Sequence, residues 1–147
     1  MLFRSVKPDR SQTQQRESSA PFDEPPLASS QIAAARDPEI NVVIHEFAHK
    51  LDMLAGEADG MPPLHAGMDR RAWRAAFEEA YQGFCDAVER GKETWLDPYA
   101  AEHPSEFFAV MSEAFFRDGA EARRRYPAVY EQLKAFYRQD PAAAALA

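Results

Sequence analysis

The sequence predicts a mainly α-helical domain over residues 31–141, with a disordered or extended lead-in at residues 1–30 and a tail at residues 142–147. Three observations lead to this interpretation. The chain has 147 residues, a length typical of one domain, and 46 % of them are hydrophobic. Beyond residue 40, apolar side chains recur at spacings of three and four, which is the period of a helix. Stretches rich in Gly and Pro separate these periodic segments and are typical of loops.

The lead-in has little that can be buried. It is rich in Ser, Gln, Pro and charge, and PFDEPPLASS shows neither the period of a strand nor that of a helix. QIAAAR, from residue 31, favours a helix, which ends at Asp37-Pro38 because the residue before a proline avoids the helical conformation. Residues 39–54, EINVVIHEFAHKLDML, predict an amphipathic or mostly buried helix that ends near Gly56. Its apolar positions are Val42, Val43, Phe47, Leu51 and Leu54.

Three more helices follow a loop at residues 56–68. Asp69 is placed to cap the first of them, which ends near Gly91 and has an apolar stripe at Trp73, Phe77, Tyr81, Phe84 and Val88. The loop GKETWLDPYAAEHP leads to the helix SEFFAVMSEAFF. Pro127 suits the first turn of the last helix, which Asp140-Pro141 ends, with a stripe at Tyr130, Leu133, Phe136 and Tyr137.

Charge and cysteine content exclude several classes of protein. The net charge is −7, and the dense basic run at residues 123–125 is interpreted as a solvated helix start, so we expect no nucleic-acid partner. The single cysteine, Cys85, excludes an internal disulfide and fits a structural thiol. No apolar run approaches the length of a membrane span, and no secretory signal is evident. We therefore expect a cytoplasmic protein that has no membrane contact.

The motif His45-Glu46-Phe47-Ala48-His49 carries the predicted chemistry. Histidines four apart on a helix project from one face, so both imidazoles can reach one ion. The glutamate between them lies close enough to contact a water molecule at that ion. This arrangement suits Zn²⁺, which prefers imidazole and carboxylate ligands and keeps one position open in catalytic sites. The alternative is a pair of core histidines hydrogen-bonded to carbonyl groups.

A catalytic zinc ion needs a third protein ligand. An extended motif with a glycine and a histidine three and six residues after His49 is excluded, because Asp52 and Ala55 occupy these places. His65 and His103 have loop residues around them and share no helical register with the motif.

Carboxylates of the later segments are simpler candidates for that ligand: Glu102, Glu106 and Glu113. Glu106 and Glu113 are seven residues apart and therefore lie on one face of the SEFFAVMSEAFF helix, whereas Glu102 precedes Pro104 and is expected in the loop. Glu106 also has a simpler interpretation, as an acidic residue that favours the positive start of a helix. The residues alone leave this choice open.

Three stretches, HEFAHKLDML, LDPYAAEHPSEFFAVMSEAFF and YPAVYEQLKAFYRQDP, resemble the zinc metallopeptidases related to Mlc titration factor A, which are of the HExxH gluzincin type. The resemblance covers residues 37–141, with the stretches in the family's order. It implies a zincin-like metallopeptidase core, which in the family is an α+β fold. Longer family members have a preceding region that supplies a small sheet. Residues 1–30 do not resemble that region, so the chain looks N-terminally shortened and its sheet is expected to be missing.

The resemblance also implies the roles of site residues. It assigns one Zn²⁺ to His45, His49 and Glu106, the general base to Glu46, and stabilisation of the oxyanion to Tyr99, seven residues before Glu106. The expected function is hydrolysis of peptide bonds by metal-activated water, with aminopeptidase-like activity as one form and a peptide as substrate.

The alternatives to peptide hydrolysis are a regulatory protein that sequesters a transcriptional repressor of the Mlc type and an inactive shortened remnant. Asp52 has two interpretations, as a residue that orients a ligand histidine and as a solvated helix residue.

Overall fold

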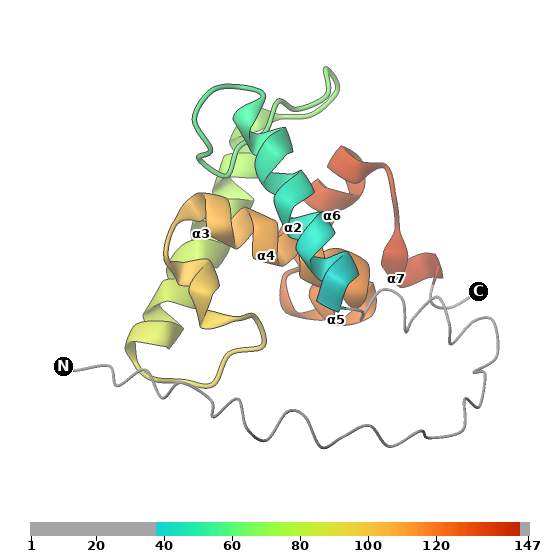
Figure 1. Cartoon of the computed structure of the whole chain (residues 1–147). Coiled ribbons are helices and arrows are strands. Elements are labelled where there is room, and N and C mark those ends of the chain that lie inside the picture. Colours follow the sequence, from blue (N-terminus) through green and yellow to red (C-terminus); the bar gives the residue numbers. More distant parts are fainter. Residues whose placement is uncertain (1–37, 145–147) are drawn as a thin grey trace.

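The computed structural model describes residues 38–144, and every regular element in that range is a helix (Figure 1). The elements are α2 (Pro38–Met53), α3 (Arg70–Glu89), the 3₁₀ helix η2 (Pro98–Ala101), α4 (Pro104–Arg117), α5 (Gly119–Arg125), α6 (Pro127–Tyr137) and α7 (Pro141–Ala144). The prediction of a mainly α-helical domain is confirmed. The lead-in and the QIAAAR helix lie outside the described residues, as do residues 145–147 of the predicted tail. None of the described helices is long and apolar enough to cross a membrane.

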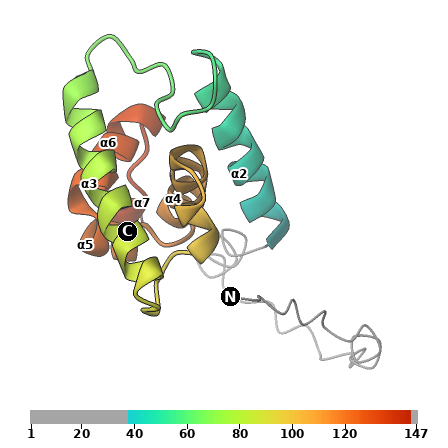
Figure 2. The ribbon, with the colours of Figure 1, turned by 90° about the vertical axis from the view of Figure 1, so that its left-hand side faces the viewer.

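Helix α4 is the centre of the fold. Figure 2 shows it between α2 on one side and α3 on the other. Pro104 occupies its first turn, where a missing N–H costs nothing, and His103 caps it by accepting a hydrogen bond from the Ser105 amide at 3.1 Å. The remainder of α4 is almost entirely buried, including Phe107 and Phe108. The helix predicted for SEFFAVMSEAFF is confirmed.

Helix α3 covers the other side of α4 with the stripe that its spacing predicts. Asp69 caps it through the Arg71 amide at 2.8 Å, as expected. Trp73 is fully buried, stacks on Phe77 with ring centroids 4.5 Å apart, and meets Phe136 of α6 at 5.6 Å. Aromatic contacts therefore join α3, α4 and α6 into one core.

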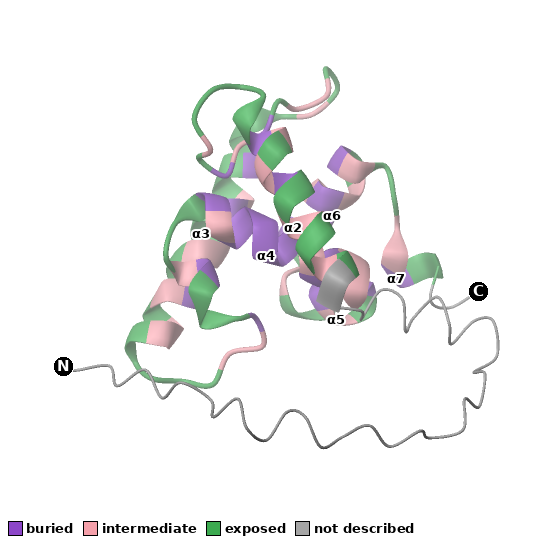
Figure 3. Ribbon diagram, viewed as in Figure 1, coloured by how far each residue is buried: buried purple, intermediate pink, exposed green. Residues whose placement is uncertain are grey.

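Helix α2 differs from its prediction. Most apolar residues of its stripe are exposed, Phe47 by 56 % and Val43 by 66 %, while the buried residues of the helix are Ala48 and Asp52 (Figure 3). The predicted helix is present, but the expected burial of its apolar residues is wrong. The physical reason is that α2 packs on α4 through the face that carries its histidines. Nothing in the part of the chain that the structure describes covers the apolar face.

Two details near the C-terminal end also differ from expectation. The basic run at residues 123–125 forms the last turn of α5, not a helix start, and two of its arginines pair with Glu121. Residues 141–144, whose last three belong to the predicted tail, form the short helix α7, in which Ala142 is fully buried. The Tyr130 hydroxyl bonds to Asp140 and accepts a hydrogen bond from the Ala142 amide at 3.0 Å, which holds α7 on α6.

Candidate metal centre

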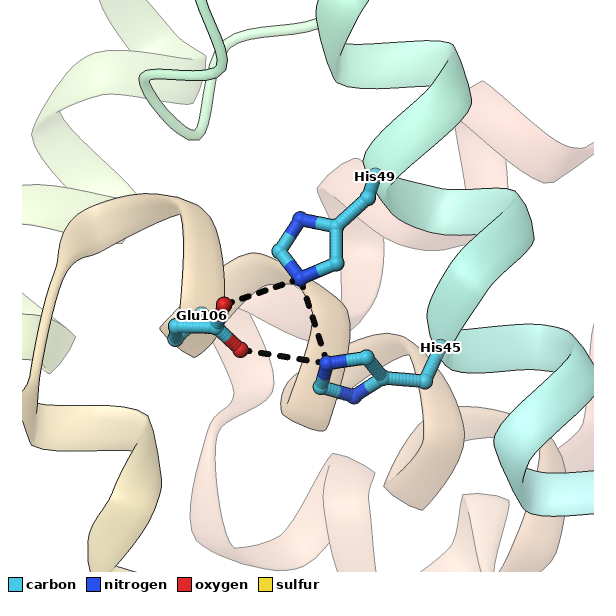
Figure 4. Close-up of side chains that lie close together, drawn as sticks. All are labelled: His45, His49 and Glu106. Atoms are coloured by element: carbon cyan, nitrogen blue, oxygen red, sulfur yellow. Dashed lines mark hydrogen bonds and ion pairs between the residues drawn. The ribbon is translucent and has the colours of Figure 1, made fainter.

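Three side chains from two helices converge at the surface between α2 and α4 (Figure 4). His45 and His49 project from α2, one turn apart, and Glu106 projects from the first turn of α4. The two Nε2 atoms of the histidines are 3.1 Å apart. Glu106 Oε2 lies 3.1 Å from His45 Nε2, and Glu106 Oε1 lies 3.0 Å from His49 Nε2. Each side chain is less than one-fifth exposed, so the cluster is partly shielded from solvent.

The loop that follows α2 fixes the position of α2 relative to the start of α4. Asp52 is fully buried and accepts hydrogen bonds from the amides of Gly60 at 2.8 Å and Asp59 at 3.3 Å. A Cβ atom on Gly60 would lie 2.8 Å from the carbonyl oxygen of Pro104, the first residue of α4. Trp73 Nε1 donates to the Gly60 carbonyl at 3.1 Å from the α3 side. This loop therefore joins the two helices that carry the cluster.

Neither sequence interpretation of Asp52 describes this arrangement. The side chain is not solvated, and within the described residues its hydrogen bonds go to loop amides and not to a histidine. Burial raises the pKa of its carboxyl group, and the two amide hydrogen bonds oppose that rise. The signal in the sequence was the Asp59-Gly60 pair, a turn dipeptide shortly after a helix, whose Gly60 has a φ of +84°.

The chemistry of the three side chains fits a metal ion. Zinc bonds of about 2.0–2.2 Å in a tetrahedral arrangement place neighbouring ligand atoms roughly 3.3 Å apart, close to the separations in the cluster. Glu106 Oε2 is buried and accepts no hydrogen bond from the described residues, although His45 Nε2 is near. The two Nε2 atoms face each other as well as the carboxylate, so their own hydrogens leave either two hydrogens crowded together or a lone pair facing a lone pair. A cation at their centre satisfies all three.

The other two carboxylate candidates lie away from the centre of the cluster. Glu113 Oε1 contacts His45 at the far edge of its ring, 2.8 Å from Nδ1. Burial raises the pKa of the Glu113 carboxyl group, and the nearby imidazole opposes that rise. Glu102 is exposed at the end of η2. The geometry thus brings only Glu106 of these three to the Nε2 atoms.

The remaining histidines make structural contacts. His65 Nε2 lies 2.7 Å from the carbonyl oxygen of Phe136, and its ring stacks on the Phe136 ring. His103 caps α4 through its Nδ1. These contacts agree with the expectation that neither histidine belongs to the cluster.

Glu46 and Tyr99 lie on the elements that carry or precede the cluster, and both are exposed. Glu46 follows His45 directly on α2. Tyr99 belongs to η2, just before α4, and its amide donates to Asp97 at 2.9 Å. Its hydroxyl makes no hydrogen bond to any residue that the structure describes, and its side chain is 54 % exposed. Both side chains are therefore accessible to a molecule that binds from solvent.

Two histidines one turn apart on a helix, a carboxylate from a neighbouring helix and a glutamate beside the first histidine are an arrangement typical of metallopeptidases with an H-E-x-x-H motif. Residues 26–138 match the family model of the glucose-regulated metallo-peptidase M90. The chain belongs to this family, whose fold is zincin-like, and a metal ion is accordingly expected at the cluster.

Curated relatives agree with this assignment. The chain is 45 % identical to Mlc titration factor A of Edwardsiella ictaluri over 104 residues, which are 69 % of this chain and 40 % of the relative. It is 44 % identical to Mlc titration factor A of Yersinia pestis over 106 residues, 70 % and 39 % of the two chains. A Synechocystis protein, slr2042, is 40 % identical over 101 residues, 69 % and 37 %. The chain thus spans about two-fifths of the length of these relatives, and the resemblance to the Mlc titration factor A family is confirmed.

Proposed function

We propose that this chain hydrolyses peptide bonds with one Zn²⁺ ion held by His45, His49 and Glu106. The observation that carries the proposal is that the Nε2 atoms of two histidines on α2 lie 3.1 Å apart and that each lies 3.0–3.1 Å from one oxygen of Glu106 on α4. Two imidazoles and one carboxylate are a ligand set that zinc favours, and a catalytic zinc site keeps a further position open. Membership in a metallopeptidase family supports the same chemistry.

When bound, the ion polarises the substrate carbonyl group and lowers the pKa of water so that it ionises near neutral pH. The protein's own residues supply the proton transfers. A carboxylate oxygen of Glu46 accepts a proton from the attacking water and afterwards donates it to the nitrogen of the leaving amine. Glu46 is suited to this role because it is exposed on the motif helix, next to a ligand and not among the ligands.

The Tyr99 hydroxyl supplies a hydrogen bond to the oxygen that becomes negatively charged in the transition state. The hydroxyl makes no hydrogen bond to any described residue, so no such bond has to break before it donates to the substrate. An aligned donor of this kind lowers the barrier by roughly 3–4 kcal/mol, because it acts where charge develops. Asp97 holds the backbone of the 3₁₀ turn on which Tyr99 lies.

The deciding experiment separates metal binding from turnover. We expect the purified full chain to retain about one zinc per chain, and His45→Ala to lose it. Glu46→Gln should keep zinc but lose activity on a chromogenic peptide, because an amide cannot accept the proton. Glu79→Gln, at another exposed position, on α3, is the matched control and should behave as wild type.

Two results would contradict the assignment. Turnover of Glu46→Gln at the wild-type rate would remove Glu46 as the base. Unchanged zinc content in Glu106→Ala would show that the third ligand lies elsewhere.

A second candidate function is binding of a transcriptional repressor of the Mlc type. The support is the name of two relatives at 44–45 % identity, Mlc titration factor A. The inactive Glu46→Gln variant distinguishes the two functions. If sequestration is the function, this variant should bind a purified Mlc-type repressor as tightly as wild type does. A chain that binds zinc but neither cleaves peptides nor binds the repressor would be an inactive remnant.

A further inference from the structure

The far edge of the His45 ring has a carboxylate partner of its own. Glu113 Oε1 lies 2.8 Å from Nδ1, while Nε2, on the opposite edge, faces His49 and Glu106. We propose that Glu113 is a positioning residue, which accepts the Nδ1 hydrogen of His45 and thereby turns the Nε2 lone pair toward the metal ion. The inference rests on the proposed metal site and concerns how one of its ligands is prepared.

The chemistry of imidazole makes the contact directional. A neutral ring carries one hydrogen, either on Nδ1 or on Nε2. A carboxylate can only accept, so a carboxylate at Nδ1 favours the tautomer with the hydrogen there. Nε2 is then left with a lone pair, which is the form that binds a metal. A carboxylate behind a ligand histidine also raises the basicity of the ring and holds its orientation.

Helix α4 contacts His45 from two sides through residues two turns apart. Glu106 is in its first turn and Glu113 is seven residues later on the same face, so His45 lies against both. The side chains of His45 and Glu113 are 18 % and 19 % exposed, and water therefore competes only weakly for their hydrogen bond. A partly buried carboxylate needs a donor, and within the described residues the His45 ring is the donor that Glu113 contacts.

The two histidines are not equivalent in this respect. His49 contacts His45 and Glu106 through Nε2, but no described residue hydrogen-bonds to its Nδ1. The proposal therefore predicts an effect on His45 alone, which a general loosening of the helices would not produce.

The test uses the purified full chain with Glu113→Ala, the nearly isosteric Glu113→Gln, and Glu102→Gln as a control at an exposed carboxylate. Zinc affinity is measured by competition with a chelator, and thermal unfolding of the metal-free protein is measured beside it. We expect Glu113→Ala to weaken zinc binding about 10–100-fold. Glu113→Gln keeps an acceptor and the side-chain shape, so its loss should be smaller. Glu102→Gln should bind zinc as wild type does.

A second readout follows the tautomer itself. Nitrogen-15 chemical shifts of the two histidine rings in the metal-free protein should show a hydrogen on His45 Nδ1 in wild type, and this preference should weaken in Glu113→Ala while His49 is unchanged. Wild-type zinc affinity and an unchanged His45 tautomer in Glu113→Ala would overturn the proposal and leave the proposed function intact. An equal fall of metal affinity and metal-free stability in both Glu113 variants, with both histidine rings altered, would show a merely structural role. A wild-type chain that binds no zinc would overturn the proposed function, and with it the proposal that Glu113 orients His45 as a ligand.

Discussion

Truncation of Phe47 tests the most consequential feature of the fold, the exposed apolar face of α2. Full burial of a phenylalanine side chain contributes up to about 3 kcal/mol to the free energy of unfolding. Phe47 is 56 % exposed, so less than half of that contribution is present to be lost. Alanine also returns about 0.5 kcal/mol through its better helix propensity. Phe47→Ala should therefore lower the free energy of unfolding by less than about 1 kcal/mol.

Phe108→Ala is the matched variant in the core. Phe108 is fully buried in α4, with ring centroids 5.9 Å from Trp73 and 6.3 Å from Phe136. Its removal leaves a cavity and should lower the free energy of unfolding by about 3–5 kcal/mol. Urea unfolding followed by circular dichroism gives both values on the same chain. A loss of 3 kcal/mol or more in Phe47→Ala would refute the reasoning, because it would mean that the outer face of α2 is covered in solution.

Three further predictions concern the loop and the site. Tyr99→Phe should lower kcat about 100–1,000-fold with little change in KM, because the hydroxyl acts mainly in the transition state. Steady-state kinetics that show only a raised KM would place Tyr99 in substrate binding. Asp52→Ala should lower the free energy of unfolding by about 1–3 kcal/mol, since two loop amides lose their acceptor, and an unchanged urea midpoint would contradict this. Gly60→Ala should lower the free energy of unfolding by more than about 1 kcal/mol, because Gly60 has a positive φ and lies against the Pro104 carbonyl. Gly83→Ala, in open space on α3, should raise the free energy of unfolding by up to about 1 kcal/mol. Thermal unfolding compares the two variants directly.

The helices of the core were predictable because the apolar residues that reveal the helical period are the same residues that pack in the core. Trp73 and Phe77 recur at helical spacing on α3, and both are buried in the core, where their rings contact Phe108 of α4. The caps were predictable for a local reason, since Asp69 binds an amide two residues later. Such contacts depend on neighbours in the sequence and need no knowledge of the tertiary structure.

The orientation of α2 was not predictable in the same way. Its spacing shows that Val43 and Phe47 share a face, but spacing does not tell what covers that face. Within residues 38–144, α4 takes the opposite face, which carries His45 and His49. The polar face is inside because His45 and His49 contact the two glutamates of α4 there. A reading by hydrophobicity alone assigns the burial to the wrong side.

The third ligand shows the same limit within the site. Glu106 and Glu113 share a face of α4, so the helical period places both toward α2 and cannot rank them. The ranking comes from the crossing of the two helices, which sets Glu106 between the Nε2 atoms and Glu113 behind Nδ1 of His45. That crossing in turn depends on Gly60, where any side chain would meet the first residue of α4. The two carboxylates are therefore complementary and not competing candidates: one faces the ion, and the other prepares the histidine that binds it.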